Sequence, residues 1–333
     1  MTLNIAYIFD ANYLVQAGVS IFSLLANNKR NEIHIFLIHP KDLPKDIERI
    51  HRTIEEFGSS YSTLYIDDLD PILEELKVPT YNGSRAVYYR LFLGDLIQQV
   101  DRLLYLDGDT IIEGDIMPLY NTDLEDNIIG MCYDSNSVEV KHAYGCKDGE
   151  PYYNNGIVLY DLKKYRETID RERTIDAISN ICARSILPDQ DFLNFYFKGR
   201  IKDLDLRYNF QPIHAMFKSD IYLHYFKKDY YSKEQIDEAS NNVVIMHAIR
   251  MFGDRPWDHS SLHPFTDEFE KYRKESLWSN YSFIKKEKKT VHKIEYHLYK
   301  LLPKRLFFYV FYKIHKRDVM KELETRREIG ADS

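Results

Sequence analysis

The segment Leu103–Asp115, LLYLDGDTIIEGD, places two carboxylates directly after a short apolar run. The first four residues have the length and residue types of a buried strand, and the chain then continues Asp107-Gly108-Asp109. Carboxylates this close repel each other unless a positive charge neutralises them. One interpretation is a divalent cation held by Asp107 and Asp109, with Gly108 allowing a close approach. The other is a polar turn, because Asp-Gly is common in turns.

Polar side chains follow two other apolar runs in the same way. The run Ile5–Phe9 is followed by Asp10 and Asn12, and Val243–Met246 is followed by His247. In parallel sheets, ligands bind at the carboxyl ends of the strands. If these strands are parallel, their carboxyl ends bring these polar residues close to Asp107 and Asp109. This makes a simple polar turn a less favoured interpretation of the acidic pair. His247 taken alone is equally consistent with a structural histidine.

The elements that would position these residues alternate between strand and helix patterns. This alternation predicts an α/β fold with a largely parallel sheet. We expect strands over Ile5–Phe9, Ile33–Ile38 and Ser62–Ile66, and helices over Leu14–Leu25 and Leu43–Phe57.

Further polar residues lie among apolar segments later in the chain. Gly83–Val100 has helical spacing and carries Arg90, which could bind a phosphate or an acid, or be a structurally paired arginine. A predicted strand over Ile128–Tyr133 ends at Asp134. The segment Tyr152–Leu162 supplies an Asn-Asn-Gly run, residues 154 to 156, before a further apolar strand.

A helix is predicted to begin at Pro188, where the chain reads Pro-Asp-Gln-Asp. Asp189 and Gln190 are therefore either site residues or part of a helix cap, since Asp is favoured at helix starts for reasons unrelated to catalysis. The stretch Gly253–Trp257 follows the late strand as a loop.

Charge is distributed unevenly along the chain. The net charge is −7, but residues 284–321 contain twelve Lys or Arg against three acids, a local balance of +9 that leaves −16 for the rest. An acidic body with no basic stripe argues against nucleic-acid binding. The 27 Tyr would suit walls that stack on sugars or bases.

Cysteine usage points to a reducing compartment. Cys132, Cys146 and Cys182 are odd in number and lack metal-ligand spacing, so we expect free thiols. The first residues, MTLNIAYIFD, enter a strand without a basic region or a long apolar run, so no signal peptide is expected. The late apolar run Leu306–Tyr312 is shorter than the ~20 residues of a spanning helix. We therefore expect a cytoplasmic protein.

The motif Asp107-Gly108-Asp109-Thr110 after an apolar strand fits two classes of enzyme. Phosphatases of the haloacid dehalogenase type carry D-x-D-x-T after a strand, and the later loop GDRPWD, residues 253 to 258, resembles their second acidic motif. Their motif stands near the start of the catalytic sheet, whereas here strand and helix units fill the first hundred positions. The required lysine is also not evident. The other class is the nucleotide-sugar glycosyltransferases, in which D-x-D binds a cation and a diphosphate.

Residues from Leu3 to about Pro264 resemble glycosyltransferase family 8, which includes bacterial lipopolysaccharide glucosyl- and galactosyltransferases and glycogenin. The motifs that carry the resemblance, in order, are IAYIFDANY, AVYYRLFLGDLI, LYLDGDTII, YYNNGIVLYDLKKY, PDQDFLN and a late His with G-x-[KR]-P-W. Each motif is weak alone, but their order and spacing are specific. The resemblance implies a GT-A (Rossmann-like) fold, with a mixed, mainly parallel sheet flanked by helices.

The resemblance also implies roles for individual residues. Ile8, Asp10 and Asn12 match the loop that holds the uridine, and Arg90 matches an arginine near the donor. The metal ligands would be Asp107 and Asp109, with Gly108 between them, and His247. The donor sugar would be lined by Asp134, Asn154, Asp189 and Gln190, with Gln190 nearest the reacting carbon. Gly253 and Arg255 match the residues that contact the diphosphate.

Two departures from the family pattern stand out. The stretch HAIRMFGDR, residues 247 to 255, is about two residues longer than the common pattern, so the roles of Arg250 and Arg255 are open. Asn155 stands where Ser or Ala is usual before the glycine.

The implied activity is the transfer of glucose or galactose, with retention of configuration, from UDP-glucose or UDP-galactose to a glycan or glycolipid. An oxygen-rich ligand set with one nitrogen suits Mn²⁺, with Mg²⁺ as the second choice. Because Gln190 is a poor nucleophile, front-face attack is favoured over a covalent intermediate on Asp134 or Asp189.

We expect a catalytic domain over residues 1–265 and a basic, amphipathic helical region over residues 266–333. Basic and aromatic residues alternate over 284–321, which suits a pair of interfacial helices broken near Pro303 and held at the inner face of a membrane. The alternative is that the same apolar residues pack on the catalytic domain or on a second copy in a homo-oligomer.

Overall fold

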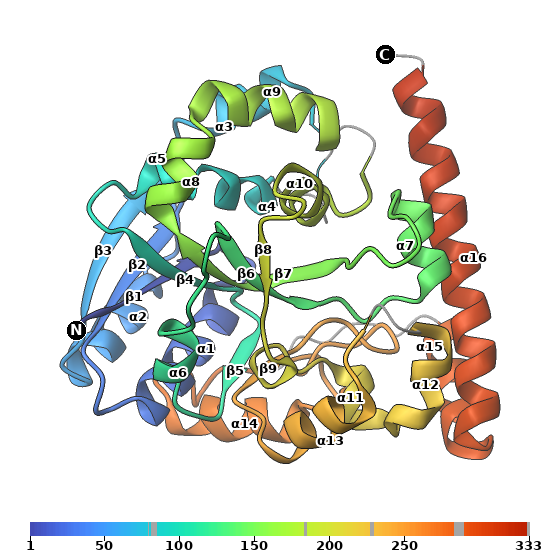
Figure 1. Cartoon of the computed structure of the whole chain (residues 1–333). Helices are drawn as coiled ribbons and strands as arrows, with labels where there is room; N and C mark the ends of the chain where they lie inside the picture. The colour runs from blue at the N-terminus through green and yellow to red at the C-terminus, as the bar shows by residue number, and fades with distance from the viewer. Residues whose placement is uncertain (79, 81–84, 183–184, 227–229, 283–289, 332–333) are drawn as a thin grey trace.

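The structure, a computed structural model, describes residues 1–78, 80, 85–182, 185–226, 230–282 and 290–331, with side chains described up to residue 325. Its centre is a seven-stranded sheet in the order β3-β2-β1-β4-β7-β6-β8 (Figure 1). The strands are β1 (Leu3–Ile8), β2 (Ile33–His39), β3 (Ser60–Tyr65), β4 (Arg102–Leu106), β6 (Ile129–Tyr133), β7 (Tyr153–Asp161) and β8 (Ile201–Asp203).

The strand directions confirm a mixed, mainly parallel sheet. β3, β2, β1 and β4 run parallel, and β6 and β8 run parallel to each other. β7 lies antiparallel to both of its neighbours, β4 and β6. A second, antiparallel sheet joins β5 (Thr110–Ile112) to β9 (Ile245–His247).

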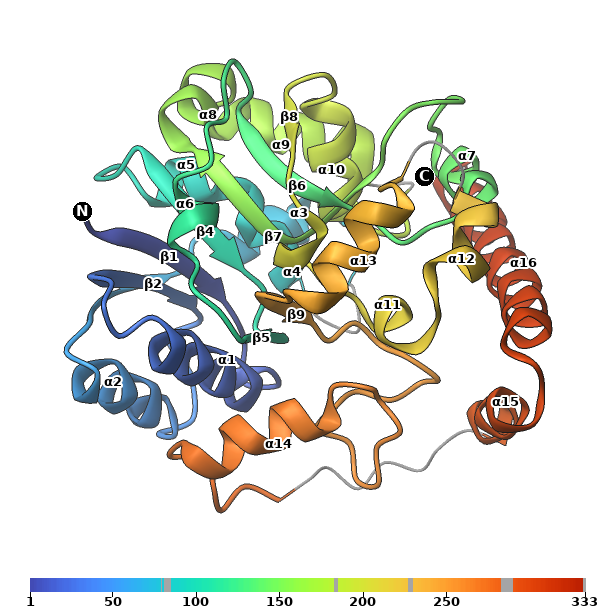
Figure 2. The ribbon, with the colours of Figure 1, turned by 60° about the horizontal axis from the view of Figure 1, so that its bottom comes forward.

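Helices cover both faces of the large sheet (Figure 2). On one face lie α1 (Leu14–Asn27), α2 (Ile47–Glu56) and α14 (Thr266–Glu275), and on the other lie α8 (Leu162–Thr168), α9 (Arg171–Ile181) and α10 (Pro188–Tyr196). Each face buries its own apolar core, because alternate side chains of a strand point to opposite faces.

Shorter helices complete the described chain. They are α3 (Asp70–Glu75), α4 (Ala86–Tyr89), α5 (Leu93–Leu96), α6 (Met117–Tyr120), α7 (Val138–Tyr144), α11 (Pro212–Met216), α12 (Ser219–Phe226) and α13 (Lys233–Asn241), with 3₁₀ turns over Arg90–Phe92 and Leu206–Tyr208.

The helical spacing over Gly83–Val100 corresponds, in its described part, to three short helical pieces rather than one continuous helix. The chain forms α4, a 3₁₀ turn and α5 instead, and residues 83–84 lie outside the described residues. Each piece buries apolar side chains, such as Tyr88 in α4, Leu91 in the 3₁₀ turn and Leu93 in α5, so the apolar face forms without a continuous helix. Arg90 is the first residue of the 3₁₀ turn, where the chain changes direction.

The late strand and the Asn-Asn-Gly run also differ from expectation. Residues 154 to 156 belong to β7 rather than preceding it, because β7 is antiparallel and begins at the edge where β4 and β6 end. His247 is the last residue of β9 rather than the residue after it.

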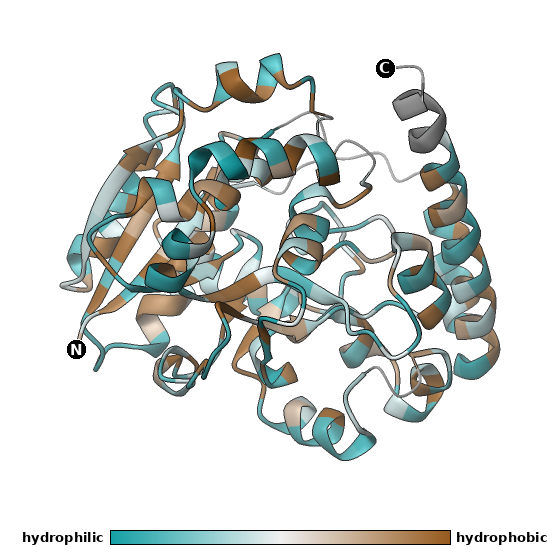
Figure 3. Ribbon diagram, turned by 45° about the horizontal axis from the view of Figure 1, so that its top comes forward, coloured by the Kyte–Doolittle hydropathy of each residue, from teal (hydrophilic) through white to brown (hydrophobic). Residues whose placement is uncertain are grey.

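The C-terminal part contains the predicted pair of helices broken at Pro303, α15 (Thr290–Leu301) and α16 (Lys304–Ala331). In Figure 3, α16 carries hydrophobic and hydrophilic residues along its described length. The larger apolar core includes three residues of α16, Phe307, Phe308 and Tyr312. These side chains therefore pack on the catalytic part of the protein, which was the alternative to membrane contact. The basic residues at 285, 286, 288 and 289 lie outside the described residues.

Two further facts concern the organisation of the chain. The Trp278 indole fills the space beside Gly18 of α1, where a Cβ atom would meet its Nε1 at 2.2 Å, so residues just after α14 share the core of α1. The division at residue 265 stays a prediction. Within the described residues, none of the helices is both long enough and apolar enough to cross a bilayer.

Candidate active site

Strand pairing brings Asp107, Asp109 and His247 together. Asp107 follows β4, and its backbone N–H donates to the carbonyl of Gly156 in β7 at 2.8 Å. In the small sheet, Thr110 lies opposite His247, so the histidine comes beside the acidic pair. The imidazole Nε2 lies 3.6 Å from Oδ2 of Asp107 and 3.3 Å from Oδ1 of Asp109.

Two residues hold the His247 ring in this position. Its Nδ1 donates to Oδ1 of Asn209 at 3.0 Å, which orients the ring so that Nε2 faces the two carboxylates. Gly156 lies under the ring, since a Cβ there would meet Cε1 of His247 at 2.2 Å. The glycine therefore provides the space that the imidazole occupies.

Arg90 neutralises Asp107 and ties three segments together. The guanidinium donates to Oδ1 of Asp107 at 2.8 Å and to the carbonyl of Asn155 at 2.9 Å, and its Nε lies 3.1 Å from Oδ2 of Asp189. It also lies over the ring of Tyr105, 4.6 Å from the centroid, and the Tyr105 hydroxyl donates to Asp107 at 2.6 Å. Arg90 is thus a paired arginine that contacts site acids.

Arg255 neutralises the other carboxylate. Its Nη1 donates to Oδ2 of Asp109 and to the carbonyl of Ala248, both at 2.5 Å. Arg250 is exposed, so the structure assigns the contact with the acidic pair to Arg255. Of the two arginines in this loop, Arg255 is therefore the one that contacts the candidate site.

The two carboxylates differ in their proton affinity. Burial raises the pKa of Asp107, and Arg90 opposes this only in part. Burial would also raise the pKa of Asp109, but the charges of Arg255 and His247 outweigh it and hold that pKa below its usual value. Asp109 is therefore the more firmly ionised carboxylate.

A second buried group, formed by Asp134, Asn154 and Gln190, lies next to the first. Asn154 donates to Oδ2 of Asp134 at 3.0 Å and to Oε1 of Gln190 at 3.2 Å, and Gln190 donates to the same Asp134 oxygen at 3.1 Å. Asn209 donates to Oδ1 of Asn154 at 2.8 Å, so it links this group to His247. Burial raises the pKa of Asp134, while both amide hydrogen bonds lower it.

Asp189 and Asn155 form the bridge between these groups. Asn155 donates to Oδ2 of Asp189 at 2.6 Å, the same oxygen that faces Arg90. The N-cap of α10 is Leu187 and makes no side-chain cap, so Asp189 is not the capping residue that its position allowed. Asn155, which stands where the family pattern usually has Ser or Ala, therefore holds the Asp189 carboxylate in place.

The remaining predicted residues lie at the same edge or near it. Ile8 is buried at the end of β1, and Asp10 accepts from the backbone N–H of Asn12 at 2.9 Å in the loop after it. A Cβ at Gly108 would meet only an ordinary contact with Ala17, at 3.4 Å. Gly253 has a φ of +76° and lies under His292 of α15.

Asn209 and Tyr105 contact the candidate site residues His247 and Asp107, and the sequence motifs did not indicate either of them. Asn209 is fully buried beside Phe210, and its only sequence signal is an amide between aromatic residues. Tyr105 lies inside the apolar run before Asp107, where it was counted as core.

The three side chains Asp107, Asp109 and His247 fit a divalent cation. Each offers one ligand atom, and these atoms lie within 4.8 Å of one another. Two carboxylate oxygens and one imidazole nitrogen are a suitable donor set for such an ion, and the Asn209 bond to Nδ1 is the outer support that metal-bound histidines ordinarily have.

Comparison with solved structures shows the fold of GT-A glycosyltransferases. The structure matches that of the galactosyltransferase LgtC in complex with donor and acceptor sugar analogues with a TM-score of 0.66 at 24% identity, covering 83% of this chain and 96% of that one.

The family model "Glycosyl transferase family 8" matches residues 4–260, and the chain belongs to this family of glycosyltransferases. It is 26% identical over 282 residues to general stress protein A of Bacillus subtilis (strain 168), covering 83% of this chain and 95% of that protein. It is 29% identical over 285 residues to lipopolysaccharide 1,2-glucosyltransferase of Escherichia coli (strain K12), covering 84% and 79%.

Family membership sets aside the phosphatase alternative. The loop that resembled the second phosphatase motif uses its carboxylates locally. Asp254 accepts from the backbone N–H of Leu262 at 2.9 Å, and Asp258 accepts from that of Arg255 at 2.8 Å. Both aspartates thus accept hydrogen bonds from backbone N–H groups of their own loop, as Asp residues commonly do in turns.

We expect Gly156→Ala to displace the His247 ring, because a methyl group would overlap it. The cost should be about 1 to 3 kcal/mol of unfolding free energy, the usual range for overpacking. Denaturant unfolding followed by tryptophan fluorescence measures this, with Gly108→Ala as the control, since that Cβ would meet only Ala17 at 3.4 Å. Equal unfolding free energies for the two variants would contradict the tight contact.

Proposed function

We propose that this glycosyltransferase moves a hexose, glucose or galactose, from its UDP-sugar to a hydroxyl group of a glycan or glycolipid, with retention of configuration. The observation that carries the proposal is the adjacency of two buried groups, Asp107 with Asp109 and His247 on one side, and Asp134 with Asn154 and Gln190 on the other. Asn209 connects them through hydrogen bonds to both. One group suits a diphosphate with its cation, and the other suits sugar hydroxyls.

The proposed cation is Mn²⁺, or Mg²⁺ as the second choice, held by Asp107, Asp109 and His247. When bound, it would supply Lewis acidity that stabilises the departing nucleoside diphosphate. Arg255, already beside Asp109, would add positive charge for the same phosphates, as the family resemblance implied. Ile8, Asp10 and Asn12 would hold the uridine at the adjoining end of β1.

The residues near the sugar favour front-face transfer over a covalent enzyme intermediate. Asp134 accepts hydrogen bonds from Asn154 and Gln190, and Asp189 is engaged by Arg90 and Asn155. A carboxylate held by such donors is a weaker nucleophile, and Gln190 is a neutral amide. In the proposed step, the bond from the anomeric carbon to the phosphate oxygen breaks, the acceptor oxygen bonds to that carbon on the same face, and the leaving phosphate takes the acceptor's proton.

We also propose that the enzyme is cytoplasmic and works at the inner face of a membrane, where a lipid-linked acceptor would lie. The relatives named for lipopolysaccharide support such an acceptor. Support also comes from apolar side chains around the α15–α16 junction that stay exposed: Val291, Ile294, Leu301, Leu306 and Tyr309. Lys300, Lys304 and Arg305 lie among them, a combination that suits an anionic surface. Pairing of two copies through this surface is the alternative.

We expect Asp109→Asn to lower turnover of UDP-glucose or UDP-galactose by about a thousandfold, because a ligand and its charge are lost where negative charge develops. Excess EDTA should do the same to the unchanged protein, and added Mn²⁺ should restore it. Asp115→Asn is the matched control, since this exposed aspartate stands in the same motif. Full activity in EDTA would contradict the metal assignment.

Gln190→Ala should reduce kcat by about a hundredfold or more and leave the Kd for the UDP-sugar nearly unchanged. A residue beside the reacting carbon acts mainly when charge develops there. Donor titration calorimetry and turnover separate the two effects, with the exposed Gln99→Ala as the control. A Kd that rises in step with the loss of rate would show that Gln190 only binds the donor.

The double variant Leu301→Glu and Leu306→Glu should weaken co-sedimentation with phosphatidylglycerol vesicles by about tenfold or more, because it replaces exposed apolar contacts with charges that the surface repels. Tyr65→Glu, an exposed tyrosine at the end of β3, is the control. Binding of the unchanged protein should also fall as salt is raised. Equal binding of both variants would instead favour pairing of copies, which sedimentation velocity detects.

A further inference from the structure

The amide side chain of Asn209 joins the two buried groups of the candidate site. Asn209 lies between the 3₁₀ turn Leu206–Tyr208 and α11, and it is fully buried. Its Oδ1 accepts from Nδ1 of His247 at 3.0 Å, and its Nδ2 donates to Oδ1 of Asn154 at 2.8 Å. An amide has one accepting end and one donating end, so its orientation matters for both neighbours.

The orientation of the Asn154 amide is fixed by its surroundings. The backbone N–H of Gly156 can only donate, and it donates to Oδ1 of Asn154 at 3.1 Å. At the other end of the amide, Nδ2 donates to Oδ2 of Asp134 at 3.0 Å. A further side chain that hydrogen-bonds to Oδ1 of Asn154 must therefore be a donor.

This requirement determines the orientation of Asn209 and, through it, that of His247. Asn209 turns its NH₂ group toward Asn154, so its oxygen faces the imidazole. An accepting oxygen 3.0 Å from Nδ1 requires a hydrogen on that nitrogen. Nδ1 is thus the nitrogen that keeps its proton, and Nε2, which faces Asp107 and Asp109, is the one left for a cation.

The same series of hydrogen bonds extends to Gln190. Its Oε1 accepts from Nδ2 of Asn154 at 3.2 Å and from the backbone N–H of Asn155 at 3.3 Å, while its Nε2 donates to Asp134 at 3.1 Å. Gln190 therefore turns its nitrogen toward Asp134. A change that rotates the Asn154 amide would remove one of the two donors that hold the Gln190 oxygen.

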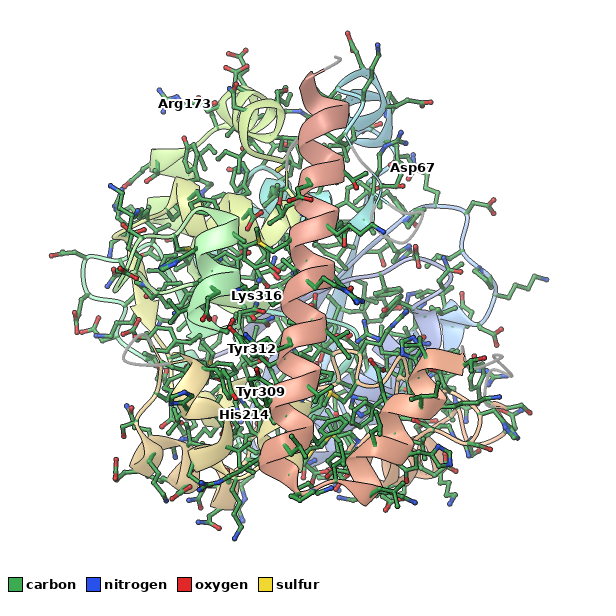
Figure 4. All side chains as sticks on the ribbon, turned by 90° about the vertical axis from the view of Figure 1, so that its right-hand side faces the viewer. Asp67, Arg173, His214, Tyr309, Tyr312 and Lys316 are labelled. Atoms are coloured by element: carbon green, nitrogen blue, oxygen red, sulfur yellow. The ribbon has the colours of Figure 1, made fainter. Side chains whose placement is uncertain are left out.

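The backbone around Asn209 is fixed on the strand that carries His247. The next residue, Phe210, pairs with β9: its N–H donates to the carbonyl of Ile245 at 2.9 Å, and its carbonyl accepts from the N–H of His247 at 3.0 Å. In α11, both ring nitrogens of His214, which is labelled in Figure 4, hydrogen-bond with tyrosine hydroxyls. A side chain on such a fixed backbone can hold its neighbours precisely.

We propose that Asn209 is a positioning residue that links the candidate cation site to the orientation of Gln190. This rests on the proposed cation and donor, and it gives a role to a residue outside the cation's ligand set. The Asn209 oxygen prepares His247 for the cation. Its NH₂ group, through Asn154, keeps the Gln190 amide in the orientation described above. Loss of the oxygen should weaken cation binding, and loss of the NH₂ group should slow the reaction.

The binding test measures the Kd of Mn²⁺ in the presence of UDP, from the electron paramagnetic resonance of free Mn²⁺. Asn209→Ala removes the acceptor and should raise this Kd by about tenfold or more, the usual effect of losing an outer support of a metal-bound histidine. Asn209→Asp keeps an accepting oxygen and should not raise it. An unchanged Kd in Asn209→Ala, or an equal rise in both variants, would overturn the proposal.

Asn28→Ala is the matched control for the binding test. Asn28 is also buried, and its side chain donates to the carbonyl of Leu24 at 2.9 Å and accepts from the N–H of Ile116 at 3.0 Å, but it lies at the end of α1. Its loss should leave the Kd of Mn²⁺ unchanged. A rise equal to that of Asn209→Ala would show a general effect of losing a buried amide and would overturn the proposal.

The kinetic test measures kcat for hydrolysis of UDP-glucose and UDP-galactose at saturating Mn²⁺. Asn209→Asp places an oxygen against Oδ1 of Asn154, so kcat should fall by about tenfold, the effect of one hydrogen bond. In a Gln190→Ala background the same change should cost less than about threefold, because the residue through which it acts is gone. Equal losses in the two backgrounds would overturn the link to Gln190.

Circular dichroism establishes that each variant is folded before its affinity is compared. If Asn209→Ala does not fold, Asn209→Leu replaces it, since leucine is similar in size to asparagine and also lacks the acceptor. Absence of Mn²⁺ binding by the unchanged protein would overturn the proposal. Absence of turnover of both UDP-sugars would instead count against the proposed function, and the Mn²⁺ affinities would still decide whether Asn209 prepares the cation site.

Discussion

The site depends on the neutralisation of two carboxylates that stand two residues apart and are largely shielded from water. Asp107 and Asp109 could not both stay ionised there without positive partners. Arg90 and Arg255 provide this charge from opposite directions, one from a 3₁₀ turn early in the chain and one from a late loop. Removing one arginine would leave a poorly compensated charge, a loss of about 3 to 5 kcal/mol for a buried pair. The requirement for countercharge thus draws distant parts of the chain together.

The same constraint explains why a single antiparallel strand matters to the site. β7 begins where β4 and β6 end, so its first residues reach the edge that carries the acids. Asn154 can then bind Asp134, Asn155 can bind Asp189, and Gly156 can leave space for His247. A parallel strand at this position would have placed its last residues at that edge, and the Asn-Asn-Gly run would lie at the opposite end of the sheet.

Sequence reasoning located the acids and their strands because both are local features. An apolar run followed by Asp-Gly-Asp is visible in a few residues, and the ends of β1 and β2 fell within about two residues of prediction. The direction of β7 could not be read, since an apolar strand has the same pattern whichever way it pairs. Asn209 was missed for the same kind of reason. Its role comes from the pairing of Phe210 with Met246, which places Asn209 beside His247, and such pairing cannot be read from composition.

The C-terminal helices show how one amphipathic element serves two surfaces. The segment that holds Phe307 and Phe308 was predicted to be interfacial, with packing on the catalytic domain as the alternative. Both residues, with Tyr312, are buried against the catalytic part, because that part offers aromatic partners such as Phe217 and Tyr225. Leu301, Leu306 and Tyr309 remain outside. One side of α16 packs beside the site, and the other exposes basic and apolar residues. If the exposed side binds a surface, the helix would hold the site at a set distance from it. In the proposed membrane arrangement, α16 would therefore set the orientation of the site as well as its distance from the surface.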